Sequence, residues 1–384
     1  MRKMTFARTA RWVPLLTLVV LFLGPSMAAF AQGDEMAFTS YYFSDSGLNK
    51  VITTSFNIAK KLLEQTSVLI DIELDHVTVP PVTAVTGATR PQRQKNEPFE
   101  KSRGQVIVGV EQGLSDTWTV SGNYYRSQEI DYVSSAVVGT ISKDFFNKNT
   151  TLTVRGQYNA DRVGKILESG EVVNSPKHVF TGAASLSQVL SKTTVLDLTY
   201  DLMVMKGTLS DPYRQVSVIN DAGSTVVVDE YHPSKRWRHA WTGRISQFIP
   251  TIRASLIGSF RYYTDTWHVH SNTSELKFNK YIINDLIFSL DYRYYSQTGA
   301  SFYKTRYVGS NYAADGYRTA DYKLKPFASN NFGLSLTLML RAFAHNSPDL
   351  EFLENSSIGI DYYRYFNTLD FSADILQASI KFSI

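Results

Sequence analysis

The sequence of 384 residues contains no cysteine. Disulfide bonds, thiolate zinc sites, iron–sulfur clusters and covalently attached c-type haem are therefore excluded, and we expect no cofactor. Beyond the N-terminal region there is also no apolar run near the roughly 18 residues that a membrane-spanning helix requires. The periodicity of the remaining sequence must therefore indicate the fold.

The N-terminus has the layout of a secretory signal peptide. Four basic residues and no acidic one accompany an apolar run over residues 13–23, which a Gly-Pro-Ser break ends. Ala29 and Ala31 then supply the small side chains of a signal peptidase site. We therefore expect residues 1–31 to be a cleaved signal peptide and residues 32–384 to form the mature protein.

The mature chain has no excess of either charge. The full sequence has 39 basic and 35 acidic residues, and four of the basic residues lie in the leader, which leaves 35 of each sign. A neutral chain has no overall electrostatic attraction for nucleic acid. We therefore expect no nucleic-acid partner.

Apolar and polar residues alternate along most of the mature chain. Within residues 252–263, for example, Leu256 belongs to an apolar set and Ser255 to the polar set between its members. Such runs are about ten residues long, the length of a tilted strand that crosses a bilayer. We count sixteen of them after residue 36, including runs over 235–248 and 320–341.

Short and long breaks alternate between these runs. The short breaks cover 113–117, 146–150, 191–194 and 249–251. The long breaks cover roughly 79–103, 162–177, 205–235 and 296–320. We therefore predict an all-β fold, a transmembrane up-and-down antiparallel β-barrel of about 16 strands with short periplasmic turns and long extracellular loops. Its location would be the outer membrane of a Gram-negative bacterium.

Paired tyrosines stand near the long-loop ends of four runs. The first tyrosines of these pairs are Tyr124, Tyr262, Tyr294 and Tyr362. A phenol ring buries its body at the acyl boundary while its hydroxyl reaches water. We predict that these four residues form an aromatic girdle facing lipid, with each following tyrosine facing the barrel mouth.

Five stretches, in order along the mature chain, resemble a family of bacterial proteins of unknown function. They are LSDPYRQVSV, YHPSKRWRHAW, FRYYTDTWHVHSNTSEL, YRYYSQTGASFY and DYKLKPFASNNFGLSL. Members of that family are thought to be outer-membrane barrels, so the resemblance implies a barrel in the cell envelope but no substrate. The apolar C-terminal residue Ile384, with Phe382 before it, also resembles the signal read by the barrel-assembly machinery. We expect that machinery, outer-membrane lipid and lipopolysaccharide as partners.

Charged residues gather on the predicted inward faces of two groups of strands. The acidic set comprises Asp71, Glu73, Asp75 and Glu111. The basic set comprises Arg155, Arg238, Arg244, Arg253 and Arg261. In a barrel of sixteen strands the two sets would lie roughly opposite each other and create a transverse field that favours dipolar solutes. Alternatively, acidic and basic side chains pair across neighbouring strands and only keep the lumen hydrated.

The segment WHVHSNTSE raises the alternative of an enzyme. His268, His270, Asn272 and Ser274 share one face, and outer-membrane phospholipases place His and Ser near the outer leaflet. Those enzymes separate the two by two residues, where this sequence has Asn272. Two histidines alone also make a weak metal site. We therefore predict no catalytic residue, no metal site and no enzymatic activity.

The favoured function is a porin-like channel for small hydrophilic solutes. One alternative is a structural or scaffolding barrel that docks a lipoprotein, a periplasmic protein or a redox partner. In that case any c-type haem would have to belong to the partner, because this chain has no cysteine to attach it. A surface lipid-modifying enzyme is the remaining alternative.

Overall fold

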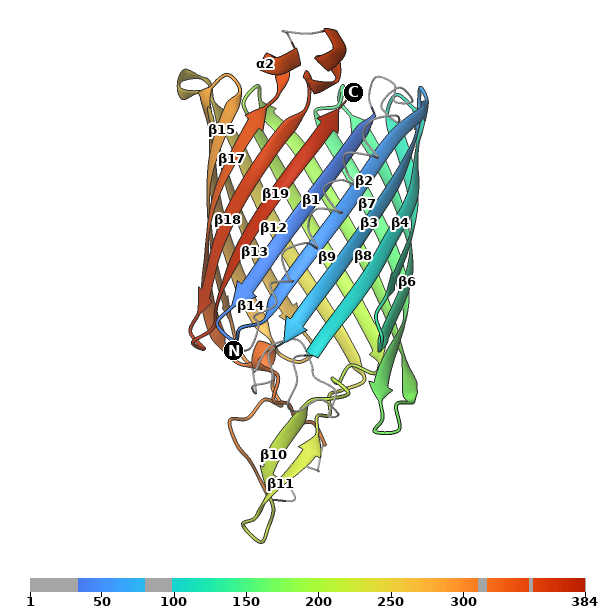
Figure 1. Cartoon of the computed structure of the whole chain (residues 1–384), viewed down its shortest axis with the longest axis vertical. Coiled ribbons are helices and arrows are strands. Elements are labelled where there is room, and N and C mark those ends of the chain that lie inside the picture. The colour runs from blue at the N-terminus through green and yellow to red at the C-terminus, as the bar shows by residue number, and fades with distance from the viewer. Residues whose placement is uncertain (1–33, 80–98, 310–315, 345–347, 384) are drawn as a thin grey trace, which may run out of the picture.

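The computed structural model describes residues 34–79, 99–309, 316–344 and 348–383, which form a closed barrel and a separate small sheet (Figure 1). The barrel has sixteen antiparallel strands, so the predicted fold class is confirmed. The predicted signal peptide lies outside the described residues. In the described part of the chain, no helix has the length and apolar character needed to cross a membrane.

Barrel strands pair with their neighbours along the sequence, and the last strand closes the ring on the first. The sixteen barrel strands are β1 (Glu35–Asp45), β2 (Lys50–Leu63), β3 (Thr66–Val79), β4 (Phe99–Ser115), β5 (Trp118–Gln128), β6 (Tyr132–Phe145), β7 (Thr150–Ile166), β8 (Val172–Ser191), β9 (Thr194–Gly207), β12 (Lys235–Ile249), β13 (Ala254–Asp265), β14 (His270–Ile283), β15 (Leu286–Gln297), β17 (Phe327–Met339), β18 (Ser357–Asn367) and β19 (Ser372–Ser383). Closure sets Met36 opposite Phe382. A closed ring leaves no strand edge with unpaired backbone groups, which a lipid environment requires.

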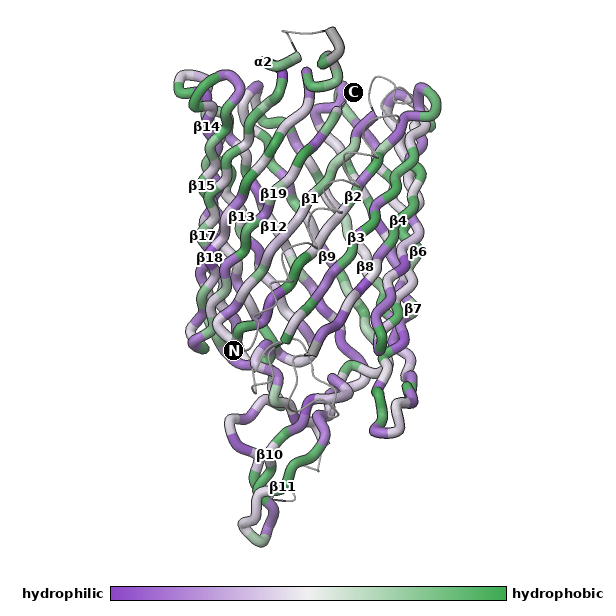
Figure 2. The backbone as a smooth tube through the Cα atoms, in the orientation of Figure 1, coloured by the Kyte–Doolittle hydropathy of each residue, from purple (hydrophilic) through white to green (hydrophobic). Residues whose placement is uncertain are grey.

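Side chains alternate between the outer surface and the lumen along each strand. On β13, Leu256, Phe260 and Tyr262 are 39%, 52% and 39% exposed on the outside. Ser259 and Arg261 point to the other face. The alternation of hydrophobic and hydrophilic residues is visible along the strands in Figure 2. The outer face is therefore an apolar band suited to lipid, and the lumen face is largely polar.

One end of the barrel, at the top of Figure 1, carries mostly short turns. The turns 64–65, 116–117 and 192–193 are two residues long. The β17–β18 connection is longer and contains α2 (Arg341–Ala344) and η5 (Pro348–Leu353). The start of β1 and the end of β19 lie at this end, which the predicted topology assigns to the periplasm.

The opposite end carries two long connections that fold into a structure we call the cap (residues 208–234, 298–309 and 316–326). The cap contains the sheet of β10 (Gln215–Ile219), β11 (Thr225–Asp229) and β16 (Tyr307–Val308), and the short η4 (Tyr322–Leu324). It projects from the barrel at the bottom of Figure 1.

Three details of the sequence prediction are wrong. The expected long loop over 162–177 is a paired extension of β7 and β8, closed by a turn at 167–171, because strand pairing satisfies the backbone beyond the barrel rim. The segment 320–326 belongs to the cap, so β17 begins only at Phe327. β4 begins at Phe99, five residues before the expected start of that strand.

Candidate pore mouth

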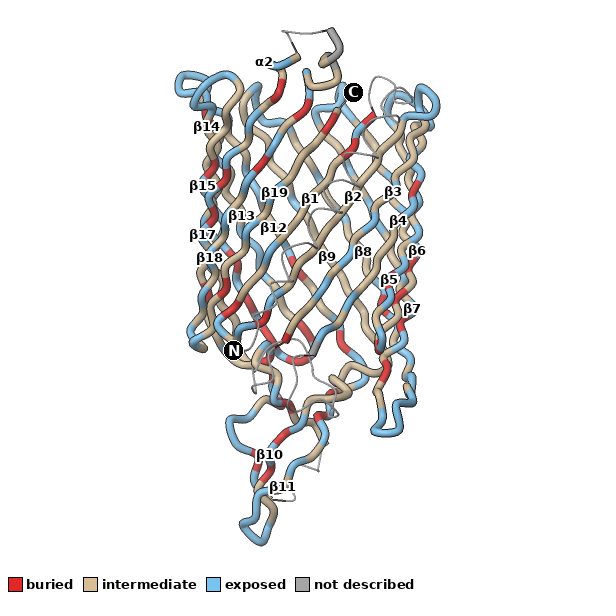
Figure 3. Tube along the Cα trace, in the orientation of Figure 1, coloured by how far each residue is buried: buried red, intermediate tan, exposed pale blue. Residues whose placement is uncertain are grey.

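The cap is fixed to the barrel by buried apolar side chains. Trp267, in the β13–β14 turn, packs edge-on against Phe302 with ring centroids 5.2 Å apart, and Leu324 joins the same cluster. A second cluster, around Val218 and Tyr307, holds the three-stranded sheet together. Figure 3 shows buried segments within the cap and where it meets the barrel. These contacts give the cap a defined position over the lumen.

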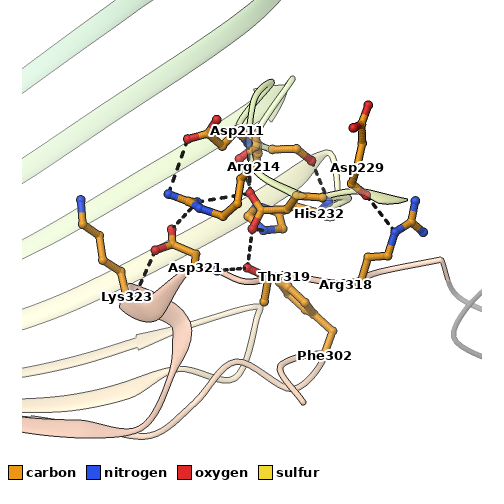
Figure 4. Close-up of polar contacts among 12 residues, drawn as sticks. Asp211, Arg214, Asp229, His232, Phe302, Arg318, Thr319, Asp321 and Lys323 are labelled. Carbon is orange, nitrogen blue, oxygen red and sulfur yellow. Dashed lines mark hydrogen bonds and ion pairs between the residues drawn. The ribbon is translucent and has the colours of Figure 1, made fainter. Parts of the chain in front are cut away.

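A buried carboxylate, Glu230, joins the two connections of the cap (Figure 4). Its Oε1 accepts a hydrogen bond from Thr319 Oγ1 at 2.6 Å and lies 3.2 Å from His232 Nε2. Its Oε2 accepts from Arg214 Nη1 at 3.3 Å, and the same nitrogen lies 3.1 Å from Asp321 Oδ2. Thr319 and Asp321 belong to the second connection and the other three residues to the first. The Glu230 cluster therefore ties the two connections together.

The charges of this cluster are mutually stabilised. Burial alone would raise the pKa of Glu230, but His232, Thr319 and Arg214 outweigh that effect, and the pKa is lowered. Burial would likewise lower the pKa of Arg214, but the carboxylates around it raise the pKa overall. At neutral pH the cap is thus held by an ion cluster in which each charge has a partner.

Between the cap and the lumen face of β12–β15 lies a pocket of about 490 Å³, which we call the mouth pocket. Its positively charged lining residues are Arg236, Arg238, Arg261, Arg293 and Lys323. Tyr263 and Tyr295, the lumen-facing members of two tyrosine pairs, also line it, as does Asp321. The cap end of the lumen is therefore lined mainly by basic side chains on the side that the cap covers.

Three of the four pocket arginines are paired with carboxylates. The pairs are Arg236 Nε to Asp265 Oδ2 at 2.8 Å, Arg261 Nη1 to Asp201 Oδ2 at 3.3 Å, and Arg293 Nε to Glu275 Oε1 at 3.2 Å. The predicted basic set includes Arg261 but omits Arg236 and Arg293. The even spacing from Arg236 to Arg238 on one strand was a signal that could have identified the former.

Arg238 and Arg244 differ from the three paired arginines in their contacts. Both lie on the lumen face of β12, and neither forms an ion pair with a carboxylate in the described part of the chain. Nη1 of Arg238 lies 3.8 Å from Met203 Sδ, and its Nε is buried with no hydrogen-bond partner among the described residues. Lys323 of the cap likewise forms no ion pair with a described residue. Two cations that line the mouth pocket, Arg238 and Lys323, therefore form no ion pair with a described residue.

The acidic set on β3 is partly neutralised by one arginine that the sequence prediction placed in a loop. Arg103, on β4, forms ion pairs with Glu73 and with Asp75, the latter at 2.7 Å from Nε. Asp75 also accepts from Thr53 Oγ1 at 2.6 Å, and Asp71 accepts from Asn57 Nδ2 at 3.3 Å. The early start of β4 brings Arg103 onto this wall. Arg103 has the same odd numbering as Gln105, Ile107 and Glu111, and this alternation was a signal that could have placed it on the lumen face.

The remaining predicted pore-lining residues occupy different places. Glu111 lies on β4 opposite Ser67 and Ser121 in the strand register. Arg155 lies on β7 and donates from Nη2 to Gln157 Oε1 at 3.0 Å. Arg253 lies in the turn before β13 rather than on a strand. It donates there to Asn284 Oδ1 at 2.9 Å, and its φ of 52° reflects the turn.

The four predicted girdle tyrosines lie on the outer face of the barrel, Tyr262 and Tyr294 near the cap end of their strands and Tyr362 at the middle of β18. Tyr124, Tyr262, Tyr294 and Tyr362 are 48%, 39%, 40% and 43% exposed. Trp241, which the prediction omitted, stacks on Tyr262 with centroids 6.0 Å apart. Such a band of amphipathic rings is typical of a membrane interface.

The histidine segment forms no recognisable reactive centre. His270 at the start of β14 is exposed and lies 3.3 Å from Tyr262 Oη through Nδ1. Ser271 and Thr273, the alternate residues, face the mouth pocket. No group of three or more metal-ligating side chains is found among the described residues.

Several solved structures share the barrel fold with this chain. A bacterial polysaccharide outer membrane secretin matches with 7% identity, 92% of this chain and 99% of that chain covered, and a TM-score of 0.51. The CymD monoaromatic hydrocarbon channel matches with 6% identity, coverages of 95% and 92%, and a TM-score of 0.46. OpdK of Pseudomonas aeruginosa, solved with vanillate, matches with 7% identity, coverages of 91% and 97%, and a TM-score of 0.44.

At such identities the likeness concerns the fold alone. Among curated proteins, none matches this sequence significantly. A family model, described as a protein of unknown function (DUF3570), matches residues 28–175 and 168–383, which together cover residues 28–383 of the 384. The stretches quoted from the sequence fall within those matches. The chain therefore belongs to the DUF3570 family.

Proposed function

We propose that this protein is an outer-membrane channel for small hydrophilic solutes. The observation that carries the proposal is a polar lumen face that leads to a charged pocket at one end. Barrels of sixteen strands are wide enough to leave an aqueous channel. A barrel that served only as a membrane-embedded scaffold would have no need of unpaired arginines on its inner face.

The cap would make the channel selective by narrowing its outer end. Gln297 Nε2 donates to the carbonyl oxygens of Lys323 and Lys325, at 2.9 and 2.6 Å, which holds η4 against β15. The ring of Tyr322 stacks against Phe371 of the β18–β19 turn, with centroids 6.4 Å apart. Solutes would therefore pass beside η4, through the mouth pocket.

In this proposal the protein lies in the outer membrane of a Gram-negative bacterium and has no enzymatic role. The apolar outer face would contact lipid, and the cap would face the lipopolysaccharide surface. Insertion would depend on the barrel-assembly machinery. Because the sequence has no cysteine, single cysteines can test the orientation on intact cells. Ser224→Cys, in the β10–β11 turn, should react with an impermeant thiol reagent, whereas Lys192→Cys, in the β8–β9 turn, should not.

Single-channel recording in planar bilayers tests the proposal directly. We expect discrete conductance steps from the refolded mature protein, and none from an unfolded sample at the same concentration. If the folded protein stays silent, the channel is ruled out and the scaffolding barrel, docking a lipoprotein or redox partner, becomes the better assignment. Turnover of phospholipid by the silent protein would instead favour the lipid-modifying enzyme.

A further inference from the structure

We propose that the mouth pocket is a binding site for a small organic carboxylate, with Arg238 as its anchoring cation. Taking this anion to be the transported solute rests on the proposed function, whereas the binding itself does not. The proposal follows from three properties of the pocket: its charge balance, an unsatisfied buried donor and its lining.

The charge balance favours an anion. Of the five cationic residues that line the pocket, Arg236, Arg261 and Arg293 are each neutralised by a carboxylate of the barrel wall. The single acidic lining residue, Asp321, shares Arg214 with Asp211 and Glu230. Arg238 and Lys323 have no ion pair with a described residue. The pocket lining thus presents two cations without an ion pair, one on the barrel and one on the cap.

Arg238 has a buried donor that lacks an acceptor. Its Nε is buried and has no hydrogen-bond partner in the described part of the chain, and the contact of its Nη1 to the sulfur of Met203 is weak. Buried polar groups almost always have partners, because leaving one unpaired is costly. A guanidinium can present two nitrogens in a planar fork that matches two carboxylate oxygens. Because Nε is itself buried, a carboxylate in the pocket would bind through the terminal nitrogens of Arg238, which lines the pocket.

The rest of the lining suits the body of such a molecule. Tyr263 and Tyr295 present ring surfaces, and Leu324 of η4 adds an apolar contact. Ser271 and Thr273 of β14 add hydroxyl groups. The volume of about 490 Å³ falls within the usual range of small-molecule sites. Phosphate shares the oxyanion chemistry, but this aromatic and apolar lining favours a carboxylate on a one-ring body.

Binding of benzoate to the full mature barrel in detergent, measured by calorimetry, tests the proposal without requiring conduction. Benzamide has the same shape without the charge, and inorganic phosphate has the charge without the ring. We expect saturable binding of benzoate, with benzamide and phosphate each about tenfold weaker or undetectable. Equal binding of benzamide, or binding of phosphate alone, would overturn the carboxylate assignment.

Matched substitutions then locate the site. Arg238→Gln should weaken benzoate binding about tenfold or more, because it removes a charge-assisted pair. Arg244→Gln removes the same charge from the same face of β12 six residues further along, about 20 Å away at the usual rise per residue. At 0.15 M salt the screening length is about 8 Å, so this control should change binding by less than about twofold. Equal losses in the two variants would show a diffuse field and no site.

If Arg238→Gln fails to fold, Lys323→Gln provides the second variant. Lys323 lies on the cap and outside the barrel wall, so its loss should leave folding intact. We expect it to weaken benzoate binding measurably, and unchanged binding in this variant would contradict a site between the cap and the wall. A channel that conducts but binds no benzoate would overturn this inference and leave the proposed function standing. Benzoate binding without conductance would support this inference and overturn the proposed function.

Discussion

The two charged walls of the lumen differ in how their charges are balanced. On the β3–β4 wall, Arg103 lies between Glu73 and Asp75 and pairs with both. On the β12–β13 wall, seven places away around the ring, Arg261 is paired with Asp201 while Arg238 and Arg244 form no ion pair with a described carboxylate. The same alternating pattern thus produces one wall with an internal counter-charge and one with a positive excess.

The difference teaches that the charges along one strand do not determine the field in a barrel lumen. A carboxylate paired with arginine on the next strand contributes mainly a local dipole, and its effect on a passing ion falls off quickly. Arg238 and Arg244 form no such ion pair with a described residue, although Asp265 and Asp197 lie opposite them in the strand register. The predicted acidic and basic sets therefore differ in how much of their charge is paired. The basic wall is also the one over which the mouth pocket and the cap lie.

The largest expected effect tests whether these walls face the lumen at all. Phe260→Arg places a charge on the outer face near the middle of β13, and should destabilise the barrel by roughly 2–4 kcal/mol if that position lies at the bilayer midplane. Ser259→Arg places the same side chain one residue earlier, on the lumen face, beside Glu275. It should fold with little change. Urea titration of both variants in lipid vesicles measures the difference, and equal losses would mean that the face assignments are reversed or mixed.

The second effect concerns the cap over the basic wall. The pKa of Glu230 is lowered in the folded state, so its charge stabilises the cap above the ordinary carboxyl value of about 4.3, and this stabilisation is lost as the pH falls through the folded value. Arg214, His232, Thr319 and the backbone N–H of Asp211 all face this carboxylate. Hydrogen exchange in β10 and β11 should therefore accelerate below about pH 4.

Glu230→Gln removes that charge at every pH and leaves Arg214 with fewer partners. We expect it to cost the cap about 1–3 kcal/mol at neutral pH, the usual penalty for a buried group that loses its partner. The acceleration of exchange at low pH should largely disappear in this variant. Asp229→Asn is the matched control, because Asp229 is the adjacent residue and is exposed, with a single ion pair to Lys165. A larger loss of cap stability in Asp229→Asn than in Glu230→Gln would show that Glu230 does not hold the two connections together.

A smaller effect is expected when the counter-charge of the acidic wall is removed. Arg103→Gln should leave Glu73 and Asp75 unpaired, and so shift the reversal potential under a salt gradient toward cation preference. The shift should be larger at 0.01 M salt, where the screening length is about 30 Å, than at 0.1 M, where it is about 10 Å. Arg155→Gln is the control, since it removes one lumen arginine that pairs with no described carboxylate. A shift of the same size in Arg155→Gln would indicate that the pairing of Arg103 with Glu73 and Asp75 has no particular effect on ion selectivity.

The barrel was predictable because its rules are local. Alternation with period two places Leu256 outside and Ser259 inside without any knowledge of the partner strands, and the length of each run sets the number of crossings. The tyrosine pairs followed from the chemistry of the interface. Strand ends were less certain, because pairing continues wherever a neighbour is available, as β7 and β8 show beyond the rim.

The cap and the balance of the walls were not predictable from one strand at a time. Glu230 and Thr319 are 89 residues apart in sequence, and nothing near either residue indicates the other. Arg103 was missed because the predicted long break extended to residue 103, although the alternation of the following residues continues back through that position. Arg238 could be placed on the lumen face, but its lack of a partner depends on four neighbouring strands.

The smallest effect distinguishes two arginines that the sequence treats alike. Arg244 lies on β12 with its side chain in the lumen, whereas Arg253 lies in the β12–β13 turn, at the end opposite the cap, and donates to Asn284. Arg244→Gln should shift the reversal potential slightly toward cations, by less than Arg103→Gln, because its charge lies away from the mouth pocket. Arg253→Gln should leave the value unchanged at 0.1 M salt, since a charge outside the lumen and beyond a screening length of about 10 Å has little effect on passing ions. Recording both variants under the same salt gradient makes each the control for the other. Equal shifts in Arg244→Gln and Arg253→Gln would mean that the β12–β13 turn forms part of the conduction path. The positive excess of this wall would then extend along the full length of the barrel.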